Sequence, residues 1–112
     1  MTRPVALAFA LAAFALAGVA PTSAADTIAE LRYENRHFVP ASLSVQAGQA
    51  MTLKVVNASK EAIEFESFKL NRERAVQPGQ STLVHLPALS PGSYDFRDDF
   101  HQDVPQGSIV AR

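Results

Sequence analysis

The chain contains no cysteine among its 112 residues. Disulfide bonds, a lipid anchor attached through cysteine and any metal site that needs a thiolate ligand are therefore excluded. A small exported domain without disulfides must be held together by the packing of its core, assisted at most by a bound ion.

The chain also lacks an excess of charge of one sign, since it has 10 Lys and Arg residues and 11 Asp and Glu residues. No basic stripe indicates a nucleic-acid partner, and no polybasic run indicates a membrane surface. Enzyme motifs are missing as well: there is no Gly-rich phosphate loop, no H-E-x-x-H and no G-x-S-x-G. We therefore expect no nucleic-acid partner, and the sequence leaves enzymatic activity open.

A long hydrophobic run occurs only at the N-terminus. Residues 5–19 are all apolar or Gly, Arg3 precedes them, and small residues follow at positions 22–25. This order is typical of a secretory signal peptide, and the run is short for a membrane span. We predict a removed signal peptide at 1–25, a single domain at 26–112, a periplasmic location and no membrane insertion after cleavage. An uncleaved anchor is the alternative.

The remaining chain alternates apolar and polar residues in short segments separated by turns. The segments are 28–34, 43–45, 51–56, 63–66, 82–86, 94–96 and 107–110. Turn residues separate several of them, as at Gly48, Pro78-Gly79 and Pro91-Gly92. This pattern predicts an all-β sandwich or barrel, with a hairpin joining 43–45 to 51–56 and one irregular turn within 68–76.

Two motifs carry a resemblance to a known fold family. Residues 38–48 read F-x-P-x-x-L-x-V-x-x-G, and residues 91–96 read P-G-x-Y-x-F. Both resemble cupredoxin domains, and the likeness extends over nearly all of the domain. The resemblance implies a cupredoxin-like Greek-key β-sandwich of about seven strands.

A closer resemblance rests on residues 57–66 and on the segment 73–79 that ends in a Pro-Gly turn. These resemble the EfeO-type cupredoxin module and the small FtrB-like proteins of bacterial ferrous-iron uptake systems. The resemblance implies a periplasmic component of iron uptake that binds or oxidises ferrous iron. Its expected cofactor is an iron or copper ion, and its expected partner is an inner-membrane iron permease or another periplasmic uptake protein.

The chain departs from blue-copper domains at their ligand positions. The resemblance places Asp98 where the family has its cysteine, Glu64 at the first histidine and Pro105 at or near the methionine. Only His101 stands at a matching ligand position. A type 1 copper site needs the thiolate and two imidazoles, so the blue-copper function is lost.

The replacements form a candidate metal site of their own. It consists of Glu64, Asp98 and His101, with Glu66 and Asp99 close by in sequence. Carboxylates with one imidazole suit iron, manganese or zinc, although copper(II) competes for most nitrogen and oxygen sites.

Plainer interpretations stay open beside this one. Glu64 and Glu66 could form the solvated face of a strand, and Asp98 and Asp99 could be turn residues. His101 alone would be unremarkable. Three functions therefore remain: a metal-binding component of iron uptake, a periplasmic copper-binding carrier, and a metal-free docking domain.

The signal-peptide prediction can be tested by the mass of the exported protein. The small residues at 22–25 place the cleavage after Ala24 or Ala25, so the mature chain should begin at Ala25 or Asp26. Intact-mass measurement on protein from the periplasmic fraction checks this. A mass that retains residues 5–19 would establish the uncleaved anchor instead.

Overall fold

The computed structural model describes residues 2–4, 10, 12 and 27–112, and residues 27–112 form nine strands and no helix. The predicted signal peptide falls largely on residues outside this description, so it stays a prediction. Within the described part of the chain, no helix is long and apolar enough to cross a membrane.

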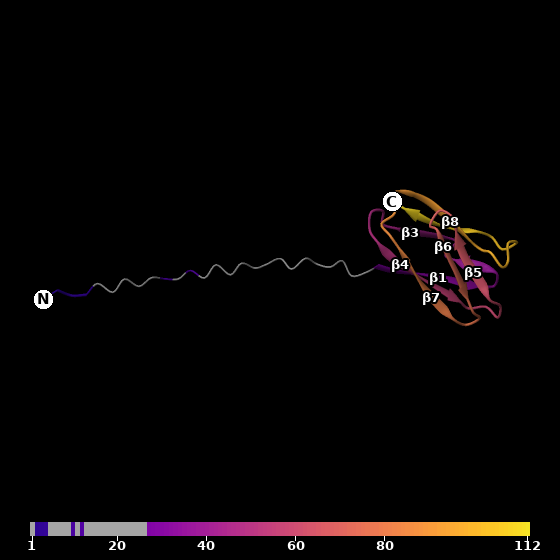
Figure 1. The fold of residues 1–112 in the computed structure, drawn as a ribbon, viewed down its shortest axis with the longest axis horizontal. Coiled ribbons are helices and arrows are strands. Elements are labelled where there is room, and N and C mark those ends of the chain that lie inside the picture. Colours follow the sequence, from indigo (N-terminus) through magenta and orange to yellow (C-terminus); the bar gives the residue numbers. More distant parts are fainter. Residues whose placement is uncertain (1, 5–9, 11, 13–26) are drawn as a thin grey trace.

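The strands form two sheets that pack face to face (Figure 1). The first sheet has the order β2-β1-β4-β7, with β1 at Thr27–Glu34, β2 at His37–Val39, β4 at Met51–Asn57 and β7 at Ser81–Leu86. The second has the order β3-β9-β8-β5-β6, with β3 at Ser42–Val45, β5 at Ile63–Ser67, β6 at Arg72–Val76, β8 at Gly92–Asp98 and β9 at Gly107–Ala111. The predicted all-β sandwich is confirmed.

Alternation along each strand builds the core between the sheets. In β5, Phe65 is buried while Glu64 and Glu66 face outward, because successive side chains point to opposite faces. Phe96 of β8 lies at the centre of an aromatic cluster, with its ring centroid 5.0 Å from that of Phe38 and 5.3 Å from that of Phe65. The core therefore fixes which side chains of β5 and β8 reach the outer face.

One local prediction, the hairpin, is wrong. Residues 43–45 and 51–56 do not form a hairpin, since β3 pairs in parallel with β9 while β4 pairs with β1 and β7. The turn at Gly48 carries the chain from one sheet to the other, and its backbone N–H donates to Leu89 O at 2.9 Å. The segment 68–76 contains the predicted turn, at residues 68–71, and then strand β6, which was not predicted. Strands β2 and β6, neither of which was predicted, bring the count within residues 27–112 to nine, against the expected seven or so.

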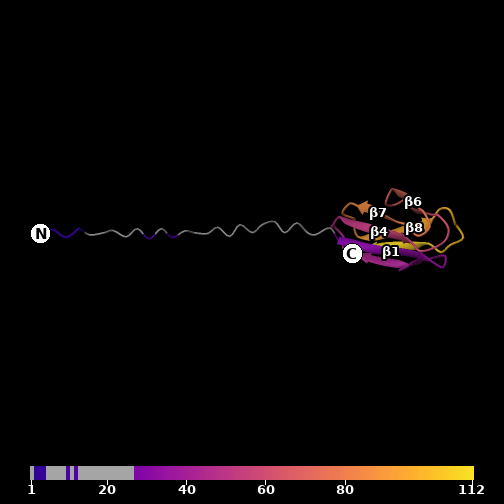
Figure 2. The same ribbon diagram turned by 90° about the horizontal axis from the view of Figure 1, so that it is seen from below.

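The loop between β8 and β9 lies at the end of the sandwich opposite the C-terminus, as both views show (Figures 1 and 2). At this end β5 lies between β6 and β8 in the second sheet. The candidate site residues all lie on β5, at the end of β8 and in this loop.

Gly107 provides a test of the packing between β8 and β9. A Cβ at this position would collide with the ring of Phe96 and approach Ala41 O to 3.0 Å. Gly107→Ala should therefore destabilise the fold by ~1–3 kcal/mol, the usual cost of overpacking a core. Chemical denaturation measures the change. Gly79→Ala is the comparison, since its Cβ would meet no atom within 4 Å and only its φ of +71° opposes the substitution. Equal stability of Gly107→Ala and the wild type would contradict this packing.

Candidate metal site

At the end of β8, the neighbouring residues Asp98 and Asp99 lie on opposite faces of the sheet. Phe96 and Asp98 are buried, whereas Arg97 and Asp99 are partly exposed. Residues two apart on a strand share a face, so Asp98 continues the inward row of Phe96 while Asp99 continues the outward row of Arg97.

The inward carboxylate, that of Asp98, is fully paired with protein donors. Its Oδ1 accepts hydrogen bonds from the backbone N–H groups of Glu64 at 3.0 Å and Phe100 at 3.1 Å. Its Oδ2 accepts one from His101 Nδ1 at 2.7 Å. The other ring nitrogen of His101 lies 2.8 Å from a carboxylate oxygen of Glu61. Burial and the neighbouring Asp98 charge raise the pKa of Tyr33 to about 12.

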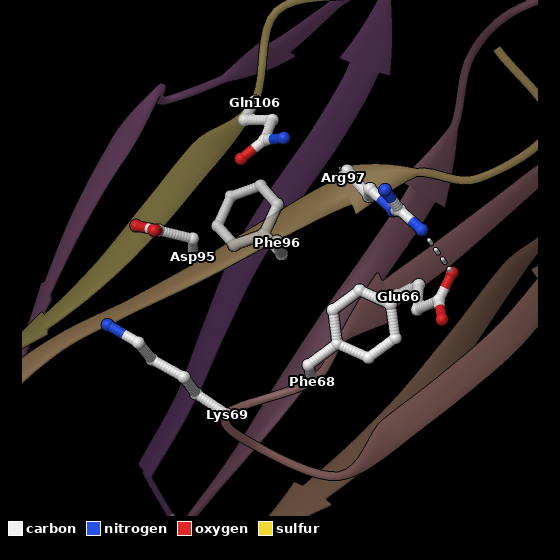
Figure 3. Close-up of a pocket in the computed structure, with 7 residues that line it drawn as sticks. All are labelled: Glu66, Phe68, Lys69, Asp95, Phe96, Arg97 and Gln106. Carbon is white, nitrogen blue, oxygen red and sulfur yellow. Dashed lines mark ion pairs between the residues drawn. The ribbon is translucent and has the colours of Figure 1, made fainter. Parts of the chain in front are cut away.

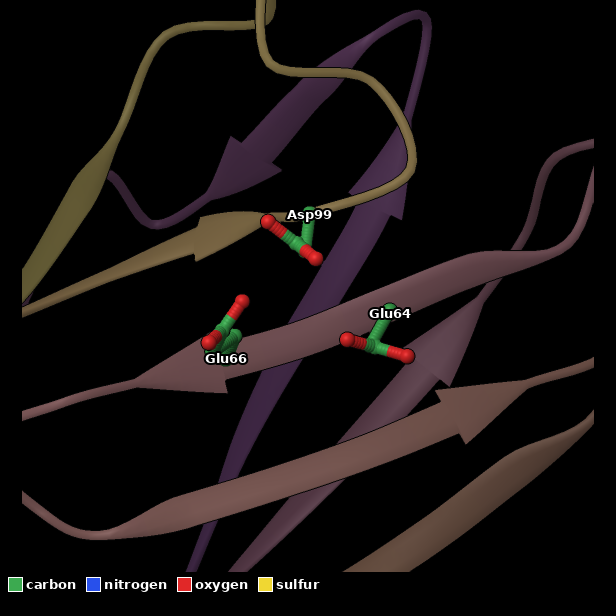
Figure 4. A group of neighbouring side chains, drawn as sticks. All are labelled: Glu64, Glu66 and Asp99. Carbon is green, nitrogen blue, oxygen red and sulfur yellow. The ribbon is translucent and has the colours of Figure 1, made fainter.

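The outward carboxylates form a cluster on the outer face of the second sheet. Glu64, Glu66 and Asp99 each place one oxygen so that the three atoms lie within 4.8 Å of one another (Figure 4). The backbone holds this arrangement, because Asp99 N–H donates to Glu64 O at 2.9 Å. Oε2 of Glu66 is buried and has no hydrogen-bond partner within the described structure. We call these three residues the outer carboxylate cluster.

Arg97 is the cation next to the outer carboxylate cluster. Its Nη2 lies 2.9 Å from Asp99 Oδ1 and 3.6 Å from Glu66 Oε2. Its guanidinium stacks over the exposed ring of Phe68 at 4.9 Å from the centroid, beside a pocket of about 210 Å³ (Figure 3). On the other side, Glu73 of β6 stands directly opposite Glu66 and adds a fourth carboxylate. Negative charge thus exceeds positive charge here.

The crowding of carboxylates is visible in their pKa values. A hydrogen bond shared with Glu73, together with partial burial and the charges of Glu73, Asp99 and Glu66, raises the pKa of Glu64 to about 7. Burial and a hydrogen bond with Asp99 raise the pKa of Glu66, against the opposing effect of Arg97. Like charges at close range disfavour the ionised form, so a cation that binds here relieves repulsion.

The five predicted ligands lie in two adjoining groups. Glu64, Glu66 and Asp99 bring their side chains together outside the sheet, whereas Asp98 and His101 pair beneath it. Glu64 belongs to the outer group by its side chain and touches Asp98 only through its backbone N–H.

Sequence reasoning missed three residues of this region, namely Glu61, Glu73 and Arg97. The period-two pattern of β8 could have placed Arg97 beside Asp99 on the outer face. Glu73 could not be found in this way, because residues 72–75 show no alternation and their strand was not predicted.

Comparison with known proteins identifies the fold family. The family model for the cupredoxin-like domain matches residues 6–111. "Uncharacterized protein RP394" of Rickettsia prowazekii (strain Madrid E) is 37% identical over 92 residues, which is 80% of this chain and 74% of that protein.

Solved structures with the same fold include copper proteins. The metal-binding domain of the Cu(I)-exporting P-type ATPase CopA of Streptococcus pneumoniae D39 has a TM-score of 0.67 at 13% identity, covering 76% of this chain and 84% of its own. Auracyanin A, a "blue" copper protein of Chloroflexus aurantiacus, has a TM-score of 0.66 at 16% identity, covering 79% of this chain and 100% of its own. At these identities the likeness concerns the fold alone.

The residues present do not fit a blue-copper centre. Such a centre requires a cysteine thiolate, and the chain has none. Both carboxylate oxygens of Asp98 already accept hydrogen bonds from protein donors, and both ring nitrogens of His101 face carboxylates. The outer carboxylate cluster offers only oxygen ligands, which suit hard cations.

The raised pKa of Glu64 predicts a dependence of stability on pH in chelator-treated protein. Between pH 4.5, its ordinary value, and about 7, folded Glu64 holds a proton that the unfolded chain has released. Its contribution to the free energy of unfolding is therefore complete at low pH and is lost as the pH rises through about 7. Glu64→Gln should make stability less dependent on pH in this window, as measured by urea denaturation at several pH values. Glu34→Gln on the other sheet is the control, and unchanged slopes in Glu64→Gln would refute the prediction.

Proposed function

This chain belongs to the cupredoxin-like domain family, and from that premise we propose that it is an exported protein that binds a hard metal ion on the outer face of its second sheet. The observation that carries this proposal is the outer carboxylate cluster, whose three oxygens lie within 4.8 Å of one another. The buried Oε2 of Glu66 supports it, because this oxygen accepts no hydrogen bond and its nearest cation, Arg97 Nη2, lies 3.6 Å away, which leaves it open to a closer cation.

Carboxylate oxygens at this density indicate the class of ion. Ferrous and ferric iron, manganese and zinc accept such ligands, and three negative charges favour the more highly charged ion. Glu64 and Glu66 would bind from β5 and Asp99 from the end of β8, while Arg97 would release Asp99 to the ion. The ion here is cargo or substrate, and no electron-transfer step follows from the residues present.

We propose iron as the ion on the ground of the resemblance of residues 57–66 to EfeO-type and FtrB-like proteins. In that role the protein would work in the periplasm, bind ferrous iron before transport and pass it to an inner-membrane iron permease or another uptake protein. A copper carrier is the alternative, since the metal-binding domain of CopA and auracyanin A, which share this fold, are copper proteins.

The proposal predicts stabilisation by metal that depends on the outer carboxylate cluster. An ion at a hundred times its Kd should raise the free energy of unfolding by ~2.7 kcal/mol. Thermal melts of chelator-treated protein with ferrous iron under anaerobic conditions, then with manganese, zinc and copper(II), measure this. Glu66→Gln and Asp99→Asn should each remove most of the shift, because each takes away one ligand charge.

Glu34→Gln, which removes one carboxylate from the other sheet, is the matched control and should keep the full shift. If copper(II) alone stabilises the wild type, the copper carrier replaces the iron proposal. If no ion does, metal binding is refuted and a docking domain takes its place; Phe68 and Phe100, 72% and 52% exposed, would then be the first residues to test for contact with a partner.

A further inference from the structure

The buried carboxylate of Asp98 is an unusual occupant for the interior of a small sandwich. Its side chain has no exposed surface, yet it lies in the row of inward residues that Phe96 begins. A buried carboxylate persists only where hydrogen bonds or a counter-charge replace its hydration. Here three protein donors do so: the backbone N–H groups of Glu64 and Phe100 and the ring of His101.

These donors come from segments that are distant in sequence. Glu64 lies on β5, whereas Phe100 and His101 lie in the loop that follows β8. Asp98 therefore joins the loop to a neighbouring strand, and two backbone bonds within the loop, His101 N–H to Asp98 O at 3.2 Å and Val104 N–H to His101 O at 3.0 Å, tighten its turn.

His101 extends this connection to a third segment. Its Nε2 lies 2.8 Å from Glu61, which stands in the loop between β4 and β5. The backbone carbonyl of Glu61 accepts hydrogen bonds from Asn57 Nδ2 at 2.7 Å and Ser59 Oγ at 3.0 Å, so this loop is itself held in place. Both nitrogens of the imidazole are thus engaged with carboxylates.

We infer that Asp98, His101 and Glu61 form a metal-independent lock that holds this end of the sandwich closed, at the place where the likeness to blue-copper domains would put a thiolate and an imidazole ligand. An ion that took Oδ1 of Asp98 would leave the N–H groups of Glu64 and Phe100 without their acceptor, and one that took Oδ2 would displace His101. The lock goes beyond the proposed function, because it stands whether or not the outer carboxylate cluster binds metal.

A double-mutant cycle in the presence of chelator tests the lock. Asp98→Asn and His101→Gln keep the size and polarity of the side chains but remove the charge or the imidazole. Each should lower the melting temperature by roughly 4–8 °C. The double variant should fall little further than the more damaging single variant, because both changes break one connection. Additive losses would show two independent contributions and would overturn the lock.

His85→Gln is the matched control, since His85 Nδ1 also bonds a side chain, Thr52 Oγ1 at 3.0 Å, but on the other sheet. It should melt close to the wild type. If the Asp98 variants do not fold, amide hydrogen exchange on the chelator-treated wild type tests the lock instead. The Phe100 amide, although it lies in a loop, should be protected at a level near that of Glu64 on β5. Rapid exchange at Phe100 would overturn the lock.

Thermal melts of the same variants with added metal distinguish this inference from the proposed function. If metal stabilises the wild type, His101→Gln should keep that shift while Glu66→Gln loses it. Loss of the shift in His101→Gln would make His101 a ligand and overturn the lock. A wild type that melts, in the presence of chelator, at the same temperature as the variants would overturn it as well. If metal stabilises nothing, the proposed function fails, and the cycle alone decides on the lock.

Discussion

The hydrogen bonding of the buried Asp98 carboxylate determines how this end of the protein is arranged. A charged group without solvent contact must have its lone pairs satisfied, and each buried partner left unpaired costs ~1–3 kcal/mol. The chain meets this demand with two backbone amides and one imidazole. These bonds tie the loop after β8 to β5.

The outer face follows directly from that inner pairing. Because Asp98 points inward, Asp99 must point outward, and its backbone N–H bonds Glu64 O at 2.9 Å. This brings Asp99 beside the outward side chains of Glu64 and Glu66, with Arg97 as the neighbouring cation. One guanidinium does not balance these carboxylates. The hydrogen bond shared with Glu73, burial and the charges of Glu73, Asp99 and Glu66 together raise the pKa of Glu64 to about 7.

Much of the fold could be predicted from local pattern, whereas the pairing of strands could not. Alternation located β5, where Phe65 is inward and Glu64 outward, because one buried face imposes a period of two. The same period does not show which strands pair, so residues 43–45 were predicted to pair with β4, whereas they pair with β9. Strand β6 was not predicted because it shows no alternation of apolar and polar residues. Its residues Arg72, Glu73 and Arg74 lie at a sheet edge, where both faces tolerate charge. The site residues could be predicted from their positions in the motif. The motif did not predict that they are divided between the inner and the outer face of the second sheet.

That division decides which acidic groups have capacity left for a ligand. Both oxygens of Asp98 already accept hydrogen bonds from protein donors, so a cation there would compete with those donors. Glu66 has an oxygen that accepts no hydrogen bond, and the pKa of Glu64 is raised by the hydrogen bond shared with Glu73, by burial and by repulsion from the neighbouring carboxylates. A cation at the outer carboxylate cluster would remove that repulsion and would compete with Arg97 for Asp99, and Arg97 can remain stacked on Phe68. Two adjacent acidic residues, Asp98 and Asp99, therefore have opposite roles, because a strand turns one into the core and the other toward solvent.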